Sequence, residues 1–389
     1  MSVRRGSVAV VGVAESDLGR VPDHTTPTDL MAQAVVRALA ACGLRLEDVD
    51  GLFATTSQLR MAPLALAEYL GLTPRYFDGT NIGGSSFQAH LAHAHAALEA
   101  RLCDVAVIAY GSTQRSVSRA AAAAREVNPW ETPYRPILPT SAYALAAARH
   151  MHAYGTTREQ MAEVAVAARQ WALLNPAAWE KEPLSIDQVL GARMISTPLT
   201  VRDCCLVTDG GGAMVLVRAD RARDLGVTPV YVLGHGAALA HQAISCMEDL
   251  TTTAAVLSGA AAFAMAGTGP FEMDVTILYD AFTITPILFL EDLGYCAKGE
   301  GGPFVSGGAL APGGRLAMNT NGGGLSYCHP GMWGILGMIE AVRQVQGGCG
   351  ARQVPGARLA LAHGNGGVLS TQCTVIFGSE ETVEGEKQC

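Results

Sequence analysis

The sequence has few charged residues, no long apolar run and no CxxC pair. Only 16% of its 389 residues are charged and 49% are hydrophobic, so the chain can bury a large core and is not expected to be disordered. No stretch reaches the ~18 uninterrupted apolar residues that a membrane-spanning helix needs. The apolar segment at residues 8–13 is too short for a signal peptide, so we expect a cytoplasmic protein.

Several kinds of binding site are also missing. The ten cysteines are scattered without the spacing of zinc ligands, and no disulfides are expected without an export signal. The net charge of −8 argues against a nucleic-acid surface, because neutralising phosphates requires clustered lysines and arginines. No GxxxxGK[ST] segment and no convincing GxGxxG fingerprint occurs, so ATP and NAD are not expected as ligands.

Short apolar runs alternate with longer alanine- and leucine-rich stretches, which is typical of α/β proteins. The predicted strands are residues 8–13, 49–55, 105–110, 213–217, 230–233, 275–279, 316–320, 359–363 and 374–377. The predicted helices are residues 27–41, 86–100, 158–174, 254–266, 285–293 and 331–345. Several strands are apolar without alternation, as expected when helices cover both faces of a sheet.

Two pairs of similar glycine-rich segments indicate an internal duplication. Residues 80–86, TNIGGSS, are similar to residues 320–326, TNGGGLS, and both are expected to follow a strand and open a helix. A second pair joins the glycines at 211–212 to those at 366–367. We therefore predict two similar halves, residues 1–225 and 226–389, with an insertion at about residues 112–200 in the first half.

A glycine-rich turn at the start of a helix can bind negative charge, because its N–H groups are unpaired and the helix dipole favours an anion. Such a turn can hold a phosphate, or the oxyanion that forms when a thioester carbonyl is attacked or enolised. The amides of Gly83, Gly84, Gly323 and Gly324 are the candidates. Ordinary α/β turns have the same composition, so this pattern alone assigns no ligand.

Groups capable of chemistry gather in three C-terminal segments: YDAF at 279–282, GGGLSYCHPG at 322–331 and HGNGG at 363–367. The carboxyl ends of parallel strands face the crevice in which ligands bind. His329 precedes a Pro-Gly pair, a poor place to bury an unpaired imidazole, so it is an acid/base candidate, with a structural role as the alternative. Cys328 beside it is a candidate nucleophile, because an imidazolium would lower the pKa of the thiol.

Two histidines on the predicted helix 86–100 are spaced like metal ligands. His90 and His93, at i and i+3, could share a metal ion. No third ligand stands near them in the sequence, so no metal site is predicted.

These segments resemble the motifs of one family. Residues 319–331, NTNGGGLSYCHPG, resemble the thiolase motif NxxGGxxxxGHPxG, and YDAF resembles the NEAF or HDCF motif that precedes it. HGNGG resembles the glycine-rich motif that carries the second thiolase cysteine. The chain is identified as a member of the thiolase superfamily, similar to its sterol-carrier and lipid-transfer-protein branch. The resemblance implies a duplicated five-layer α-β-α-β-α fold with an inserted loop domain, and a homodimer.

The sequence departs from the thiolase pattern where thiolases carry cysteine. Family spacing places Gly84, flanked by Ser85 and Ser86, where thiolases have the nucleophilic cysteine of a CASG segment, and His363 replaces the second cysteine. Ordinary acyl transfer needs a nucleophile that holds the acyl group. The chain instead resembles cysteine-lacking aldolases that act on β-hydroxyacyl-CoA thioesters in steroid side-chain degradation, which carry tyrosines at the positions of Tyr279 and Tyr327.

The resemblance therefore implies retro-aldol cleavage of a β-hydroxyacyl-CoA, with CoA as part of the substrate and no tightly bound cofactor. It also implies an OB-fold and zinc-ribbon partner subunit. The residues expected to move protons or to line the polarising pocket are Tyr279, Tyr327, His329, His363, Asn365, Gly366, Gly83, Gly84, Ser85, Ser86, Gly323 and Gly324. Two alternatives stay open: a β-ketoacyl-CoA thiolase that uses Ser85, Ser86 or Cys328, and a non-catalytic protein that binds acyl-CoA or lipid.

Overall fold

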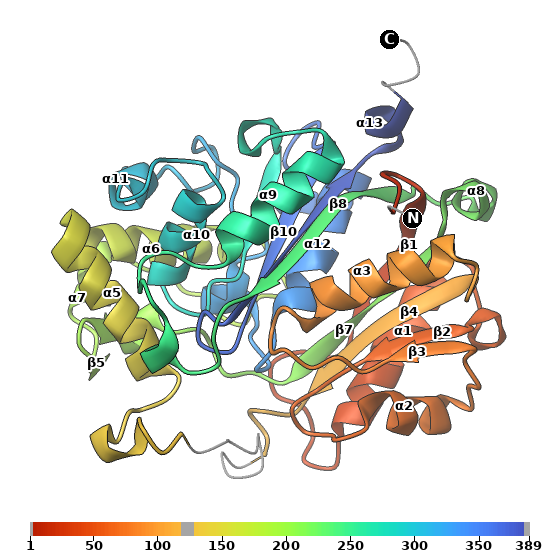
Figure 1. Cartoon of the computed structure of the whole chain (residues 1–389), viewed down its shortest axis with the longest axis horizontal. Helices are drawn as coiled ribbons and strands as arrows, with labels where there is room; N and C mark the ends of the chain where they lie inside the picture. Colours follow the sequence, from red (N-terminus) through yellow and green to blue (C-terminus); the bar gives the residue numbers. More distant parts are fainter. Residues whose placement is uncertain (1–2, 118–127, 385–389) are drawn as a thin grey trace.

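A nine-stranded sheet dominates the structure, a computed structural model that describes residues 3–117 and 128–384 (Figure 1). Its strand order is β3-β2-β4-β7-β1-β8-β11-β10-β9. The strands are β1 (Val8–Glu15), β2 (Gly51–Ala54), β3 (Tyr76–Asp78), β4 (Val105–Ser112), β7 (Gly210–Arg218), β8 (Val230–Leu239), β9 (Val275–Leu278), β10 (Leu359–Gly366) and β11 (Thr371–Gly378). A separate two-stranded sheet contains β5 (Met194–Ser196) and β6 (Leu199–Thr200).

All six predicted helices are present with ends close to those expected. The α-helices are α1 (Pro27–Ala41), α2 (Ala62–Leu70), α3 (Ser86–Glu99), α5 (Thr140–Tyr154), α6 (Arg158–Leu173), α7 (Ile186–Leu190), α8 (Ala219–Ala222), α9 (Ala255–Ala266), α10 (Ile284–Asp292), α11 (Gly301–Val305), α12 (Gly334–Gln346) and α13 (Glu380–Glu384). The start of α1 shows why such ends are predictable: Thr26 accepts the N–H of Asp29, and Pro27 occupies the first turn.

The sheet has two halves with the same connectivity. The order β2-β4-β7-β1 in the first half is repeated as β9-β10-β11-β8 in the second, and the halves meet through two residue pairs between β1 and β8. Helices α3 and α12 contact each other and strands of both halves, whereas α1 packs on β1, β4 and β7, and α9 packs on β8 and β11. The predicted five-layer α-β-α-β-α arrangement is confirmed.

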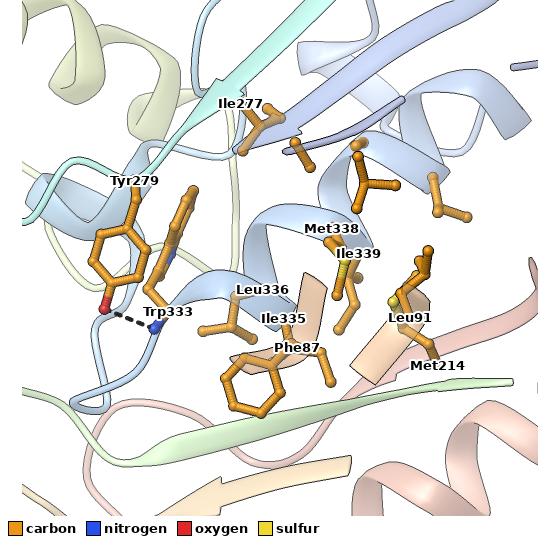
Figure 2. Packing of buried hydrophobic residues seen from close by; sticks show 14 of the residues in the cluster. Phe87, Leu91, Met214, Ile277, Tyr279, Trp333, Ile335, Leu336, Met338 and Ile339 are labelled. Carbon is orange, nitrogen blue, oxygen red and sulfur yellow. Dashed lines mark hydrogen bonds between the residues drawn. The ribbon is translucent and has the colours of Figure 1, made fainter. Parts of the chain in front are cut away.

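The central layer has an apolar core. Phe87 and Leu91 of α3 lie near Ile335 and Ile339 of α12, and all four side chains are fully buried (Figure 2). Because both helices are enclosed between the two half-sheets, their N-terminal ends are held at a fixed separation. A Cβ at Gly334, where α12 begins, would lie 2.1 Å from the carbonyl oxygen of Gly84, so the two segments are in direct contact.

The segment between β4 and β7 holds helices α5, α6 and α7 and strands β5 and β6, grouped on the left in Figure 1. Helix α6 packs on residues 323–327, and α5 packs on α10. The inserted residues therefore cover the loops of the second half that carry the YDAF and histidine motifs. The boundaries at 225 and at about 112–200 stay predictions.

Two sequence predictions about the second half are wrong. Residues 316–320 form no strand, because Asn319 adopts a positive φ of 50° and only Met318 makes an isolated bridge, to Thr276. The glycine-rich residues 320–326 do not open α12. From Gly323 onwards they form part of a π-helical turn, Gly323–Tyr327, and α12 begins only at Gly334. Helices α2 and α5 were not predicted at all.

Among the described residues, no helix combines the length and the hydrophobicity required to cross a membrane. The nine cysteines in this part of the chain are all free thiols. Cys389 lies outside the described residues.

Candidate active site

Tyr279 and His329 form a hydrogen-bonded pair beside the end of β9. Tyr279 directly follows β9, and its hydroxyl oxygen lies 3.1 Å from Nε2 of His329, which precedes α12. The two rings meet edge to face with centroids 5.7 Å apart. Tyr279 is 4% exposed and His329 is 8% exposed, so the pair is nearly closed off from solvent. The structure thus brings together two of the predicted catalytic residues.

The backbone of Trp333 also hydrogen-bonds to the Tyr279 hydroxyl. Its N–H donates to the hydroxyl oxygen of Tyr279 at 3.0 Å (Figure 2). The hydroxyl is then free to donate its own proton to Nε2 of His329. Burial raises the pKa of Tyr279 well above its usual range and lowers the pKa of His329 to about 4, so both groups are neutral near pH 7. A neutral imidazole that accepts a hydrogen bond can act as a general base.

Gly84 lies against the ring of Tyr279. A Cβ at residue 84 would lie 2.2 Å from Cε2 of Tyr279 and 2.6 Å from the carbonyl oxygen of Asn365. These separations are far below van der Waals contact, so no side chain fits at residue 84 while Tyr279 keeps its place. Tyr279 therefore fills the space that a nucleophilic side chain at this position would need.

The hydroxyls of Ser85 and Ser86 are used by the local fold. Both residues are fully buried. The Ser85 oxygen lies 2.6 Å from Oγ1 of Thr371, and the Ser86 hydroxyl donates to the carbonyl of Gly83 at 2.6 Å while accepting from the N–H of Ile82. None of these partners is a base, so neither serine is activated as a nucleophile.

Cys328 is also poorly suited to be a nucleophile. It is 1% exposed, and its sulfur lies 3.1 Å from Oγ1 of Thr208. Burial raises the pKa of Cys328 to about 12, so it stays a thiol near pH 7. The imidazolium expected to activate it is absent, because the neighbouring His329 is neutral and bonded to Tyr279.

The structure does not bring Tyr327 to the Tyr279–His329 pair. Its hydroxyl donates to Oε1 of Glu15 on β1 at 3.0 Å, and Arg343 of α12 holds both oxygens of the same carboxylate at 2.6 and 2.5 Å. Burial, with a smaller effect from Glu15, raises the pKa of Tyr327 well above its usual range. Tyr327 therefore ties the loop before His329 to β1 and α12.

The side chain of His363 likewise has other partners, although its backbone carbonyl accepts the N–H of Tyr279 at 3.1 Å. Its Nδ1 lies 2.9 Å from Oγ1 of Thr374 and its Nε2 lies 2.9 Å from Oε1 of Gln372, so both ring nitrogens have partners within the sheet. The ring packs against Phe289, and burial lowers the pKa of His363 to about 4. Sequence reasoning placed His363 in the pocket because β10 ends there, but the side chain lies among β10, β11 and α10.

The predicted polarising amides divide into two groups. The N–H groups of Gly323 and Gly324 already donate to Asn321 at 2.9 Å and to Asp280 at 2.6 Å. By contrast, the Gly83–Gly84 backbone packs on the turn after β10: a Cβ at Gly83 would lie 2.7 Å from the nitrogen of Gly367 and 2.9 Å from the Cα of Gly366. Gly84 therefore lies next to the Tyr279 ring and Gly366 lies against Gly83, whereas Gly323 and Gly324 serve the fold of their own loop.

Tyr143 of α5 joins this region and was missed by the sequence analysis. Its hydroxyl accepts from Nδ2 of Asn365 at 2.8 Å and donates to the carbonyl of Gly367 at 3.1 Å. Its ring stacks on Phe282 of the YDAF segment, with centroids 4.3 Å apart. No local pattern marks Tyr143, because it is one aromatic residue in an alanine-rich helix.

A pocket rich in arginine opens beside the loop that carries His329. Its lining includes Arg115, Arg169, Arg202, Trp179, Glu180, Cys205, Leu325 and Ser326. Glu180 pairs with Arg169 at 3.1 Å and lies 3.6 Å from Arg202, so one carboxylate faces two guanidinium groups, while the guanidinium of Arg115 lies over the ring of Trp179. The N–H of Cys205 donates to the carbonyl of Ala281, which joins the pocket to the segment that begins with Tyr279. The three arginines are far apart in the sequence, so spacing did not reveal them.

The two histidines spaced like metal ligands have different surroundings. His93 pairs with Asp78 through Nδ1, whereas His90 is fully buried between Phe53 and Phe87. In residues 3–117 and 128–384, no group of three histidine, cysteine or acidic residues could hold a metal ion.

Comparisons with known proteins identify the family. The model of the family described as thiolase C-terminal domain-like matches residues 236–379. An acetyl-CoA acetyltransferase of Methanothermobacter thermautotrophicus is 34% identical over 388 residues, covering 95% of this chain and 99% of that protein. The chain belongs to the thiolase superfamily.

Two other proteins similar to this chain are named as aldolases. A steroid side-chain-cleaving aldolase of Thermomonospora curvata is 32% identical and covers 89% of this chain and 92% of its own length. The solved structure of the Ltp2-ChsH2(DUF35) aldolase has a TM-score of 0.87 and 30% identity over 97% of this chain. Human mitochondrial 3-ketoacyl-CoA thiolase, at 16% identity and a TM-score of 0.72, shares the fold.

Proposed function

We propose that this thiolase-superfamily enzyme catalyses retro-aldol cleavage of a β-hydroxyacyl-CoA thioester. The observation that carries the proposal is the position of Tyr279: its ring fills the space of a nucleophile at residue 84, and its hydroxyl is bonded to a neutral His329. A site of this kind supports proton transfer and not acyl transfer. The two relatives named as aldolases support the same reaction.

The proposed reaction begins with removal of a proton from the β-hydroxyl group of the substrate. That proton passes to the oxygen of Tyr279 as the Tyr279 hydroxyl proton passes to Nε2 of His329, so the imidazole becomes an imidazolium. The O–H electrons form the carbonyl of the departing aldehyde or ketone, and the Cα–Cβ bond breaks. Its electron pair enters the thioester as an enolate. The proton then returns through the same pair to Cα, which gives a shortened acyl-CoA.

The thioester oxygen of the enolate needs hydrogen-bond donors in a water-poor site. We assign this role to backbone N–H groups of the Gly83–Gly84 segment, which lies next to the Tyr279 ring, and of the turn at Gly366 on which it packs, rather than to Gly323 and Gly324, whose amides are occupied. The rigid contact between the two glycine segments keeps such donors in place before the substrate binds.

The arginine-rich pocket is the proposed site for the CoA phosphates. Guanidinium groups bind phosphate strongly, and Arg202 is exposed at the rim. Replacing Arg202 by alanine is expected to raise KM for the acyl-CoA about tenfold and to leave kcat within about twofold, since the phosphates lie outside the reacting group. Steady-state kinetics measures both constants. Arg358→Ala removes an exposed arginine paired with Glu381 elsewhere and is expected to change neither.

We also propose a homodimer, with a further partner subunit of the OB-fold and zinc-ribbon type. Edge strand β3 carries Phe77, 66% exposed, next to an apolar groove that includes Met61 and Leu64, 64% and 61% exposed. A strand with a free outer edge beside such a surface favours pairing with a second copy. The partner rests on the resemblance and on the two-component title of the similar aldolase structure.

The test of the proposed function is product analysis with a panel of β-hydroxyacyl- and β-ketoacyl-CoA thioesters. The assay contains the chain alone or with a candidate partner subunit, and sedimentation of the same samples gives the subunit number. We expect an aldehyde or ketone plus a shortened acyl-CoA from the hydroxy substrates, and no loss of rate after iodoacetamide treatment. Thiolysis of a ketoacyl substrate that iodoacetamide abolishes, or an acylated side chain on the intact protein, would establish the thiolase alternative instead.

A further inference from the structure

Asp280 holds the loop of His329 while its neighbour Tyr279 holds His329 itself. Oδ1 of Asp280 accepts the N–H of Gly324 at 2.6 Å, and Oδ2 accepts the N–H of Leu325 at 3.3 Å. Both donors belong to the π-helical turn Gly323–Tyr327, which ends two residues before His329. Of the two consecutive residues after β9, Tyr279 therefore binds the His329 side chain and Asp280 binds the turn before it.

Glycine lets the turn pack closely between the carboxylate and the imidazole. Gly323 adopts a φ of +63°, and a Cβ there would lie 2.0 Å from Oδ2 of Asp280. A Cβ at Gly324 would lie 3.2 Å from Oδ1 of Asp280 and 3.0 Å from Cδ2 of His329. With so little free space, a displacement of the turn from the carboxylate also displaces the backbone that contacts the His329 ring.

The carboxylate of Asp280 is buried without a cationic partner. Asp280 is fully buried, and it takes part in no ion pair among the described residues. The titratable groups near the carboxylate are Cys205, Tyr279 and His329, all neutral near pH 7. The uncharged side chain of Asn319 also lies near it. Burial raises the pKa of Asp280 to about 7, although hydrogen bonds from backbone N–H groups, and a smaller effect from the side chain of Asn319, act in the opposite direction. A buried carboxylate is stabilised chiefly by such hydrogen bonds, so its ionisation and the position of the turn depend on each other.

We propose that Asp280 is a positioning residue, whose ionised carboxylate keeps the Gly323–Tyr327 turn in place and thereby holds His329 against Tyr279. Protonation puts a hydrogen on one of the two accepting oxygens and removes the negative charge, so both oxygens become weaker acceptors for the amides of the turn. The hydrogen-bonded geometry of His329 is therefore expected to weaken as the pH falls through 7. The kinetic consequence rests on the proposed retro-aldol reaction, whereas the effect on His329 does not.

The experiment uses Asp280→Asn in the full chain, with and without substrate. The amide keeps one acceptor for Gly324 but presents N–H groups to Leu325. We expect kcat to fall about 100-fold, KM to change less than about threefold, and the kcat titration near pH 7 to disappear. Without substrate, ¹⁵N NMR of the histidine ring nitrogens is expected to show a shifted His329 signal and an unchanged His363 signal, since His363 has its own partners.

Two further variants make the outcome decisive. Asp203→Asn replaces another buried aspartate, which accepts from Thr200 and Thr283, and is expected to leave the His329 signal unchanged. If Asp280→Asn does not fold, Gly323→Ala tests the same contact, because the three atoms nearest to a Cβ there all belong to Asp280 and not to His329, and the same shift is expected. An unchanged His329 signal in a folded variant overturns the positioning role even if retro-aldol activity is confirmed. A shifted signal in a protein without that activity keeps the positioning role and rejects the proposed function.

Discussion

Replacing Tyr279 by phenylalanine is expected to lower kcat by about 10²- to 10⁴-fold, with KM changed only a few-fold. The phenyl ring still packs against Gly84 and Trp333, so the shape of the site is kept. The variant lacks the oxygen through which the substrate proton would reach Nε2 of His329. Steady-state and single-turnover kinetics with a β-hydroxyacyl-CoA identified in the product screen measure the effect.

The control for this substitution is Tyr295→Phe. Tyr295 is also a buried tyrosine, and its hydroxyl oxygen lies 2.7 Å from Oγ1 of Thr276, away from the reacting pair. Loss of this hydroxyl is expected to lower the free energy of unfolding by about 1 kcal/mol and to leave kcat unchanged. If Tyr279→Phe keeps more than a tenth of the parent kcat, the substrate proton does not pass through this hydroxyl.

Substituting Gly84 by alanine is expected to destabilise the folded protein by about 3 kcal/mol, because the new Cβ would overlap the Tyr279 ring and the carbonyl of Asn365. Urea unfolding followed by circular dichroism measures the change in the free energy of unfolding. Gly348→Ala is the matched control. A Cβ there would lie 3.8 Å from its nearest neighbour, so its effect is expected to stay within about 0.5 kcal/mol.

A double-mutant cycle tests whether Gly84 and Tyr279 depend on each other. In a Tyr279→Ala background the ring is gone, and Gly84→Ala is expected to cost at least about 1 kcal/mol less than in the parent. The contact with the Asn365 carbonyl remains, so the cost does not vanish. Additive effects of the two substitutions would show that Tyr279 does not fill the space beside residue 84.

The site could be predicted in part. The motifs located His329 and Tyr279 and the change from cysteine to glycine at residue 84, because these lie in short, recognisable segments. They did not distinguish the roles of Tyr279 and Tyr327, which lie in two of the motifs but have different partners: His329 for one and Glu15 for the other. Nor did they reveal Tyr143, Asp280 as the acceptor for the turn, or the arginines of the pocket.

The amino-acid sequence by itself determined the alternation of strands and helices, the similarity of the two halves and the glycine that excludes a side chain at residue 84. These features depend on residues close together in the chain, such as the Thr26–Asp29 cap of α1 or an apolar run. The tertiary structure alone decided which groups meet. Tyr279 and His329 are 50 residues apart, and Tyr327 and Glu15 are 312 apart, so only the packing of α12 between the two half-sheets brings each pair together.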